Sequence, residues 1–387
     1  MSETWWIKPE ELDEDQKRIV SLPLDKNYLV LGPPGSGKTN LLLLRASHLY
    51  KGGYPDIAIL LFSRKLQEFV ASGASKYFLS TDVIKTSTRW LMDFIRNNDG
   101  RIRRSNDFIE NRLNLLTEAK RIVDHLDLDY HIEAILLDEA QDYLPEEIKL
   151  FSQMSKRLFA VADSKQKIYN GESSLDTLKE IVDATCELRY HYRNGLKICK
   201  LADGLSKDSS SNQLLSPTAN YNEDSNPSKV DVIKSDNFEE QLQRIIERID
   251  IQLKTYPGEL IGIISPRRDE TNLIGEFFLK SHLTSKVNFQ DSEEGFILDT
   301  EKPIIITTVH SAKGLEFRAL HIVSSEYIKK FPKQRNIAFT AITRTKTSLS
   351  IYHVGDIPGF FEQAIVNIQS PPQMPEFKDL FNNEGLE

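Results

Sequence analysis

The sequence predicts an α/β protein in which helices flank parallel β-sheets. Short apolar runs alternate with helix-forming stretches along most of the 387 residues, a rhythm that is typical of parallel sheets. A glycine-rich turn at 32–39 joins one of these runs to a helix-forming segment, which is the local setting of a phosphate-binding loop. The rhythm resumes after a polar stretch at 207–228. The chain is therefore long enough, and regular enough, for two domains.

In the first half of the chain, five apolar runs are of the right length for buried strands. Leucine and alanine, which favour helix, dominate the segment that follows the glycine-rich turn. The alternation of strands and helices favours a parallel sheet. The predicted strands are Tyr28–Leu31, Ile57–Phe62, Val83–Thr86, Ala134–Leu137 and Leu158–Ala162.

The second half repeats this pattern after the polar stretch, whose Ser, Asn and Pro content predicts a surface loop or linker. Residues 237–254 are predicted to form an amphipathic helix. The predicted strands are Val230–Ile233, Leu260–Ser265, Pro303–Thr308, Ala319–Val323 and Ser348–Tyr352. We therefore expect domains at 1–190 and 191–365, followed by an acidic, loosely ordered tail at 366–387.

The turn after the first predicted strand fits the phosphate-binding pattern G-x-x-x-x-G-K-[ST]. Its backbone N–H groups and the start of the following helix favour the negative charge of phosphates. Lys38 is expected to reach the β- and γ-phosphates, and the Thr39 hydroxyl is expected to bind Mg²⁺. A chance glycine turn is the alternative, which the flanking strand and helix disfavour. The residues are Gly32, Pro33, Pro34, Gly35, Ser36, Gly37, Lys38 and Thr39.

Two adjacent carboxylates follow the predicted strand Ala134–Leu137. Asp138 is expected to bind Mg²⁺, and Glu139 to orient the attacking water, which is the arrangement that metal-assisted hydrolysis needs. A solvated strand end is the alternative for this pair taken alone. Together with the phosphate loop, the pair predicts that the chain binds and hydrolyses ATP with Mg²⁺.

Composition sets outer limits on function. Apolar residues make up 40% and charged residues 27% of the chain, as in ordinary soluble proteins, and no apolar run reaches membrane-spanning length. The N-terminus lacks the pattern of a secretory signal, and Cys186 and Cys199 are too few for a disulfide framework, so we expect a cytoplasmic protein. The net charge of −8 means that any nucleic-acid surface must be a local patch.

Eight short segments carry further patterns, namely Asp15–Arg18, Leu61–Lys65, Ser87–Trp90, Asp138–Asp142, Val161–Tyr169, Leu188–Asn194, Thr307–Phe317 and Ala338–Arg344. In this order and in these strand contexts, they resemble the motifs of superfamily 1 helicases of the UvrD/Rep type. The residues at 308–317 fit the pattern T-x-H-x-x-K-G-L-E-F. The resemblance covers about 16–352. It implies a P-loop NTPase with two RecA-like lobes, whose parallel sheets are flanked by helices, and an ATP site in the cleft between the lobes.

The resemblance also implies roles around the nucleotide. Gln16 would read the adenine, Glu316 would accept a hydrogen bond from the ribose, and Gly314 would allow close backbone approach. Arg193 and Arg344 would reach the transition state from the second lobe as arginine fingers, for which the planar guanidinium is suited. A surface ion pair is the ordinary alternative for a single arginine.

Nucleic-acid contacts follow from the same resemblance. Phe62 and Tyr169 would stack on bases, although both could instead be core aromatics. Thr88, Thr308 and His310 would bind backbone phosphates, and His310 could instead be a structural histidine.

Within Val161–Tyr169, Gln166 would sense the γ-phosphate and link hydrolysis to movement. The chain departs from the family pattern just after this segment. Gly171 and Glu172 stand where the family has a Trp and an Arg, and an acidic residue there would repel phosphate. Ala162 and His191 replace an expected Gly and Asn, changes that are readily tolerated. The segments that carry large accessory subdomains in the family are short here, between Trp90 and the strand at 134–137 and again between 280 and 303.

These observations predict an ATP-dependent translocase or helicase on single-stranded nucleic acid, with DNA favoured over RNA and with weak or partner-assisted unwinding. The alternative is a nucleotide-gated switch subunit of a complex, for example with a nuclease in anti-phage defence or DNA repair. A decayed ATPase is disfavoured, because Lys38, Thr39, Asp138, Glu139 and both arginines are present. No membrane partner is expected.

Overall fold

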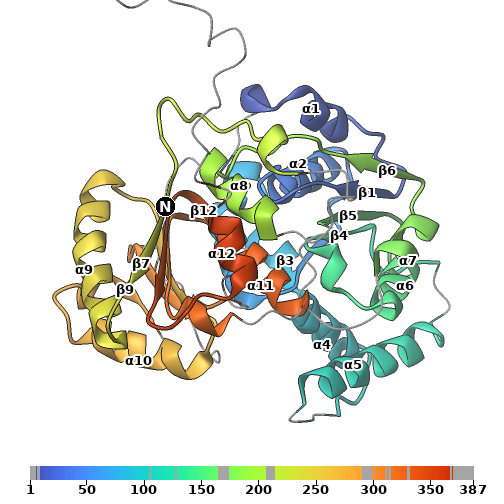
Figure 1. The fold of residues 1–387 in the computed structure, drawn as a ribbon. Coiled ribbons are helices and arrows are strands. Elements are labelled where there is room, and N and C mark those ends of the chain that lie inside the picture. Colours follow the sequence, from blue (N-terminus) through green and yellow to red (C-terminus); the bar gives the residue numbers. More distant parts are fainter. Residues whose placement is uncertain are drawn as a thin grey trace, which may run out of the picture.

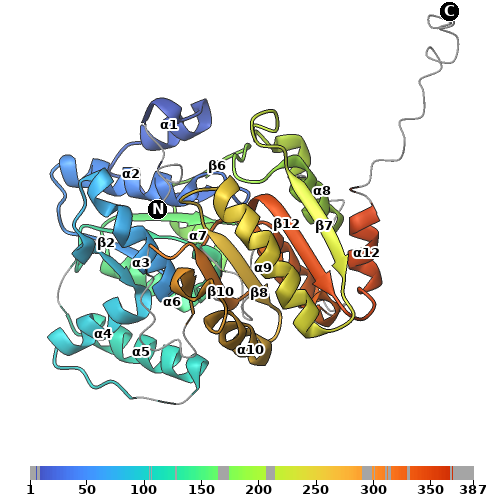
Figure 2. The same cartoon turned by 90° about the vertical axis from the view of Figure 1, so that its left-hand side faces the viewer.

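A computed structural model describes residues 6, 9–103, 105, 107–126, 129–163, 174–205, 214–289, 299, 301–309, 312, 315–328, 332–366 and 368. Within these residues the chain forms two six-stranded sheets, each covered by helices on both faces (Figures 1 and 2). The strands that pair in each sheet run parallel to one another. The predicted α/β fold with two RecA-like lobes is confirmed.

The first lobe is built on the sheet with strand order β3-β2-β4-β5-β1-β6. Its apolar strands are buried on both faces, because successive side chains point to opposite sides: Val30 faces one helical layer and Leu29 the other. Helices α1–α3 cover one face, and α4–α7 cover the other. The strands are β1 (Tyr28–Leu31), β2 (Ile57–Leu61), β3 (Ile84–Thr86), β4 (Ala134–Leu137), β5 (Leu158–Ala162) and β6 (Ala184–Glu187). The helices are α1 (Glu14–Val20), α2 (Lys38–Lys51), α3 (Arg64–Gly73), α4 (Ser87–Asn97), α5 (Phe108–Val123), α6 (Pro145–Met154) and α7 (Ser174–Ile181).

The second lobe is built on the sheet with strand order β7-β12-β11-β8-β10-β9. Helices α9 and α10 cover its outer face, while α8, α11 and α12 cover the other. The strands are β7 (Lys229–Lys234), β8 (Ile261–Ser265), β9 (Val287–Asn288), β10 (Ile304–Thr308), β11 (Phe317–Ile322) and β12 (Thr345–His353). The helices are α8 (Leu196–Leu205), α9 (Phe238–Thr255), α10 (Arg268–Leu279), α11 (Pro332–Ile342) and α12 (Gly359–Val366).

All ten predicted strands are present, with ends shifted by a few residues at most. Phe62 lies just after β2 and Val83 lies in a short 3₁₀ turn before β3. The predicted helix at 237–254 is α9, and the Asn237 side chain caps it by accepting a hydrogen bond from Glu240 N at 2.9 Å. Strands β6 and β9 were not predicted. The domain limits at 1–190 and 191–365 stay a prediction, and most of the tail at 366–387 lies outside the described residues.

A buried histidine in β11 leads to a prediction about stability. The His321 ring nitrogens lie 2.8 Å from Gln252 Oε1 and 3.1 Å from the Tyr352 hydroxyl oxygen, and burial lowers the pKa of His321 to about 3. In the unfolded chain this pKa is about 6.5, so the unfolded state binds the extra proton between these values. The free energy of unfolding that neutral His321 contributes above pH ~6.5 is therefore lost as the pH falls below that value.

We expect urea unfolding between about pH 6 and pH 4 to show a steeper loss of unfolding free energy in the wild type than in His321→Gln, by up to ~1.4 kcal/mol per pH unit. Glutamine keeps a hydrogen-bonding group in the strand but does not titrate. Parallel pH profiles for the two proteins would contradict this account.

Candidate functional site

The glycine-rich loop connects β1 to α2, and its geometry explains its glycines. Gly35 and Gly37 have φ values of 78° and 83°, a backbone region that side chains disfavour. Lys38, the first residue of α2, points back along the loop and donates hydrogen bonds to the carbonyl oxygens of Gly32 at 2.7 Å and Pro33 at 2.8 Å. Burial lowers the pKa of Lys38, and the nearby carboxylate of Asp163 opposes this effect. The lysine is thus held, desolvated, beside the loop.

The predicted metal ligands meet at the end of β4. The Thr39 hydroxyl donates to Asp138 Oδ2 at 2.8 Å, so the structure brings the two residues together. Burial, followed by the charge of Glu139, raises the pKa of Asp138 to about 6. Mg²⁺ is usually held by one or two carboxylates together with substrate phosphates. One carboxylate beside one hydroxyl fits this requirement, and no group of three or more metal-binding side chains occurs in the described part of the chain.

Glu139 is held in an unusual backbone conformation, with φ 50° and ψ 44°. Such non-glycine residues carry strain and cluster at functional sites. The Gln141 amide donates to Glu139 Oε2, while its own oxygen accepts from Asp163 N at 3.0 Å. Gln141 therefore fixes the direction of the Glu139 carboxylate from the backbone of the neighbouring strand end.

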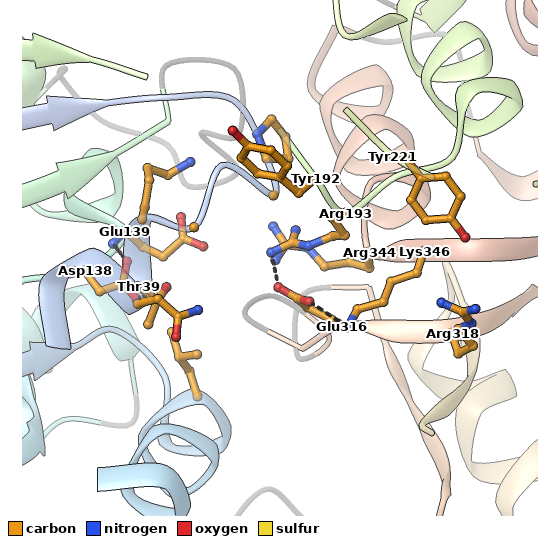
Figure 3. Close-up of a pocket in the computed structure, with 16 residues that line it drawn as sticks. Thr39, Asp138, Glu139, Tyr192, Arg193, Tyr221, Glu316, Arg318, Arg344 and Lys346 are labelled. Carbon is orange, nitrogen blue, oxygen red and sulfur yellow. Dashed lines mark hydrogen bonds and ion pairs between the residues drawn. The ribbon is translucent and has the colours of Figure 1, made fainter. Parts of the chain in front are cut away.

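The second lobe contributes the opposite wall (Figure 3). Arg193 and Lys346 both pair with Glu316, the latter at 3.4 Å between Nζ and Oε2. Burial would raise the pKa of Glu316, but the charges of Arg193 and Lys346 prevail and lower it. Arg344 is buried in the same group, and burial lowers its pKa. Glu316 thus offsets part of the positive charge of the three cationic side chains around it.

The two lobes touch directly at the glycine-rich loop. Tyr192 N donates to Gly35 O at 3.1 Å. A Cβ atom on Gly35 would lie 2.5 Å from Arg193 Cβ, a distance that real Cβ contacts do not reach. Glycine at this position therefore allows the second lobe to place Arg193 against the loop.

A cavity of about 270 Å³ separates the two walls. Tyr192, Tyr221, Arg318 and Lys346 also line it, and none of them was predicted to take part in the site. Tyr192 lies inside a recognised motif, while Arg318 and Lys346 are the second residues of β11 and β12. The full lining is Pro34, Gly35, Gly37, Lys38, Thr39, Asn40, Leu66, Asp138, Glu139, Tyr192, Arg193, Tyr221, Glu316, Arg318, Arg344 and Lys346.

Other predicted site residues lie elsewhere. Gln16 is buried behind the loop and donates to Ser36 O at 3.0 Å, so it supports the loop and does not line the cavity. Its contact with adenine stays a prediction, as do the roles of Gly32, Pro33 and Ser36. Gln166, Gly314, Tyr169 and His310 lie outside the described residues.

The described nucleic-acid candidates do not line the cavity. Phe62 is half-buried after β2, with its ring centroid 5.9 Å from that of Tyr143 in an edge-to-face arrangement. Thr88 is exposed in the first turn of α4, and Thr308 ends β10. All three follow carboxyl ends of parallel strands. Their roles stay predictions.

Two family models match parts of this chain. Residues 16–172 match the AAA domain family, and residues 303–352 match the UvrD-like helicase C-terminal domain. A solved structure, the C-terminal domain of a possible DNA helicase from Lactobacillus plantarum, is similar with 16% identity and a TM-score of 0.33, over 45% of this chain and 93% of that one. No curated protein sequence matches the chain. None of the helices that the structure describes could cross a membrane.

Proposed function

We propose that this chain, which belongs to the UvrD-like helicases, is a cytoplasmic ATP-dependent translocase on single-stranded nucleic acid. DNA is favoured over RNA, and unwinding is weak or assisted by a partner. ATP hydrolysis would drive closure and opening of the two lobes. The observation that carries the proposal is the cavity between the lobes, with its pairing of phosphate loop, carboxylates and arginines.

The charges of the cavity suit a magnesium nucleotide. Five lysine or arginine side chains and three carboxylates line it, an excess of two cationic groups. A bound Mg²⁺ would add two positive charges, which together offset the roughly four negative charges of ATP, and the ion's own charge belongs in this balance. A neutral or cationic ligand would leave the excess uncompensated.

Each wall has a distinct task in the proposed reaction. Lys38 and the loop N–H groups would bind the phosphates. Thr39 with Asp138 would hold Mg²⁺, whose charge would offset that of the phosphates. Glu139, aimed by Gln141, would orient water. Arg193 would exchange its partner Glu316 for the phosphate oxygens, so that Glu316 keeps the arginine neutralised until a nucleotide arrives.

A nucleic-acid track is proposed along the carboxyl ends of the strands. In the first lobe it includes Phe62 and Thr88. In the second lobe Arg267 lies after β8 with its guanidinium 4.8 Å from the ring centre of Tyr327, and both side chains are exposed. Aromatic and arginine planes stack on bases without regard to sequence. This pair was not singled out in the sequence, because it lies outside the recognised motifs.

A nucleotide-gated switch for a protein partner, such as a nuclease, is the second candidate. The net charge of −8 and the acidic Glu172 favour it, because both oppose a phosphate backbone. In that case lobe closure would change affinity for the partner.

ATP turnover with and without a single-stranded thymidine oligomer tests the proposal. We expect the oligomer to raise turnover, and binding to weaken steeply as salt rises, because contacts with phosphates release counterions. Glu139→Gln should still bind ATP while turnover falls by about 10²–10⁴-fold, the usual contribution of a general base.

If the oligomer neither binds nor raises turnover, the translocase proposal is ruled out. The switch would then be supported by a stoichiometric partner that co-purifies in an ATP-dependent manner. Near wild-type turnover in Glu139→Gln would remove Glu139 as the base.

A further inference from the structure

Arg112 in α5 is a buried arginine that no recognised motif contains. Its side chain is 9% exposed. Nε donates to Glu147 Oε1 at 2.6 Å, and Nη2 donates both to Glu147 Oε2 and to the Asp142 carbonyl oxygen, the latter at 2.9 Å. The planar guanidinium is therefore fixed in position along its edge.

Both partners of this edge belong to the segment that follows Glu139. Asp142 N donates to Glu139 O at 2.9 Å and so closes the turn that carries the proposed base. Glu147 Oε2 accepts from Leu144 N at 2.9 Å, which fixes the start of α6. We call 139–142 the hydrolytic turn. Arg112 holds it at its far end through the Asp142 carbonyl and is not among the residues that line the cavity.

The same guanidinium also contacts a different element. It lies 5.1 Å from the ring centre of Phe62 after β2, within the range of a cation–π contact. Tyr143, the residue that follows the hydrolytic turn, meets the Phe62 ring from another direction. Arg112 thus contacts both the proposed base-stacking residue and the hydrolytic turn.

We propose that Arg112 is a positioning residue that couples nucleic acid bound at Phe62 to the orientation of Glu139. The inference rests on the proposed function. A base that stacks on Phe62 shifts the ring against the guanidinium. Because the fork is planar and hydrogen-bonded on two sides, this shift moves the Asp142 carbonyl and with it the turn that aims Glu139.

The test compares ATP turnover, with and without the thymidine oligomer, in wild type and Arg112→Lys. Lysine keeps a positive charge for Glu147, but its single ammonium cannot hold Glu147 and Asp142 in one plane and cover the ring. The stimulation ratio is the turnover with the oligomer divided by the turnover without it. We expect this ratio to fall about tenfold in Arg112→Lys, within the range by which such networks change coupling. Oligomer affinity, from fluorescence anisotropy, should change less than about threefold, because Phe62 itself remains.

Arg121→Lys is the matched control. Arg121 lies on the same helix and also forms a two-bonded pair with a glutamate, Glu118, but its side chain is 54% exposed. We expect its stimulation ratio to equal that of the wild type. If Arg112→Lys does not fold, Arg112→Met combined with Glu147→Gln removes both charges together and keeps a side-chain oxygen that can accept from Leu144 N at the start of α6.

The outcomes separate the two hypotheses. A wild type that the oligomer does not stimulate contradicts the proposed function. A stimulated wild type together with an equally stimulated Arg112 variant overturns the inference alone. A loss of stimulation that a weaker oligomer affinity fully explains also overturns it, because Arg112 would then only support the binding surface.

Discussion

Arg193→Ala should lower kcat for ATP hydrolysis by roughly 10³–10⁵-fold, which is the contribution that an arginine finger makes to kcat. The guanidinium lies at the cavity wall, paired with Glu316, and Arg193 Cβ lies against the phosphate loop. A planar, permanently charged group suits the oxygens of the transferring phosphoryl group. Because these contacts form chiefly in the transition state, nucleotide affinity should change far less than kcat. Steady-state kinetics and nucleotide titration measure the two effects separately.

Arg189→Ala is the control for this prediction. Arg189 lies four residues earlier in the same segment, but it is exposed and pairs with Asp15 at 2.8 Å. Exposed pairs contribute little to stability, so its kcat should stay within about twofold of wild type. A kcat for Arg193→Ala within tenfold of wild type would show that Arg193 is not the arginine finger. Arg344, which lines the same cavity, would then be the next candidate.

Lys38→Ala should abolish measurable turnover without destabilising the protein. The ammonium is buried against two loop carbonyls, and burial lowers its pKa, so the folded state holds this charge at a cost. Removing one preorganised donor from a phosphate site costs about 10²–10³-fold or more in rate. Stability and activity should therefore separate, as they do at sites that are strained for function.

Thermal unfolding and ATP turnover measure the two properties. We expect Tm of Lys38→Ala to equal or exceed that of the wild type. Lys51→Ala, at the other end of α2, should lose only the contact of Lys51 with the Phe78 ring at 4.0 Å and keep full turnover. A destabilised, active Lys38→Ala would show that this lysine is structural.

Much of the fold could be predicted because fully buried strands are continuous apolar runs. Leu136 and Ile263 lie in such runs, and their sheets were anticipated closely. Strand β6 escaped prediction because it is an edge strand of Ala, Thr, Cys and Glu with three exposed positions, and β9 because it has only two residues. Neither carries the apolar signal on which periodicity depends.

The candidate site was only half visible in the sequence, for a physical reason. Local backbone geometry, which short motifs record, places Lys38, Thr39, Asp138 and Glu139 in the candidate site. Residues such as Lys346 enter the cavity only because β11 and β12 lie side by side. Pairing of distant strands leaves no local pattern, so Arg318 and Lys346 were not predicted, whereas Arg193, Glu316 and Arg344 lie in recognised motifs and were.

The contact between Gly35 and the Tyr192–Arg193 segment has a mechanical consequence. It would place the fulcrum of any relative rotation of the lobes beside the proposed phosphate site. Displacements near a fulcrum are small, so Arg193 would need to move only slightly to contact or leave the phosphates. The far side of the second lobe, where α9 and α10 lie, has the longest lever arm and sweeps the greatest distance. Small movements of the lobes at the site would thereby become large displacements of α9 and α10.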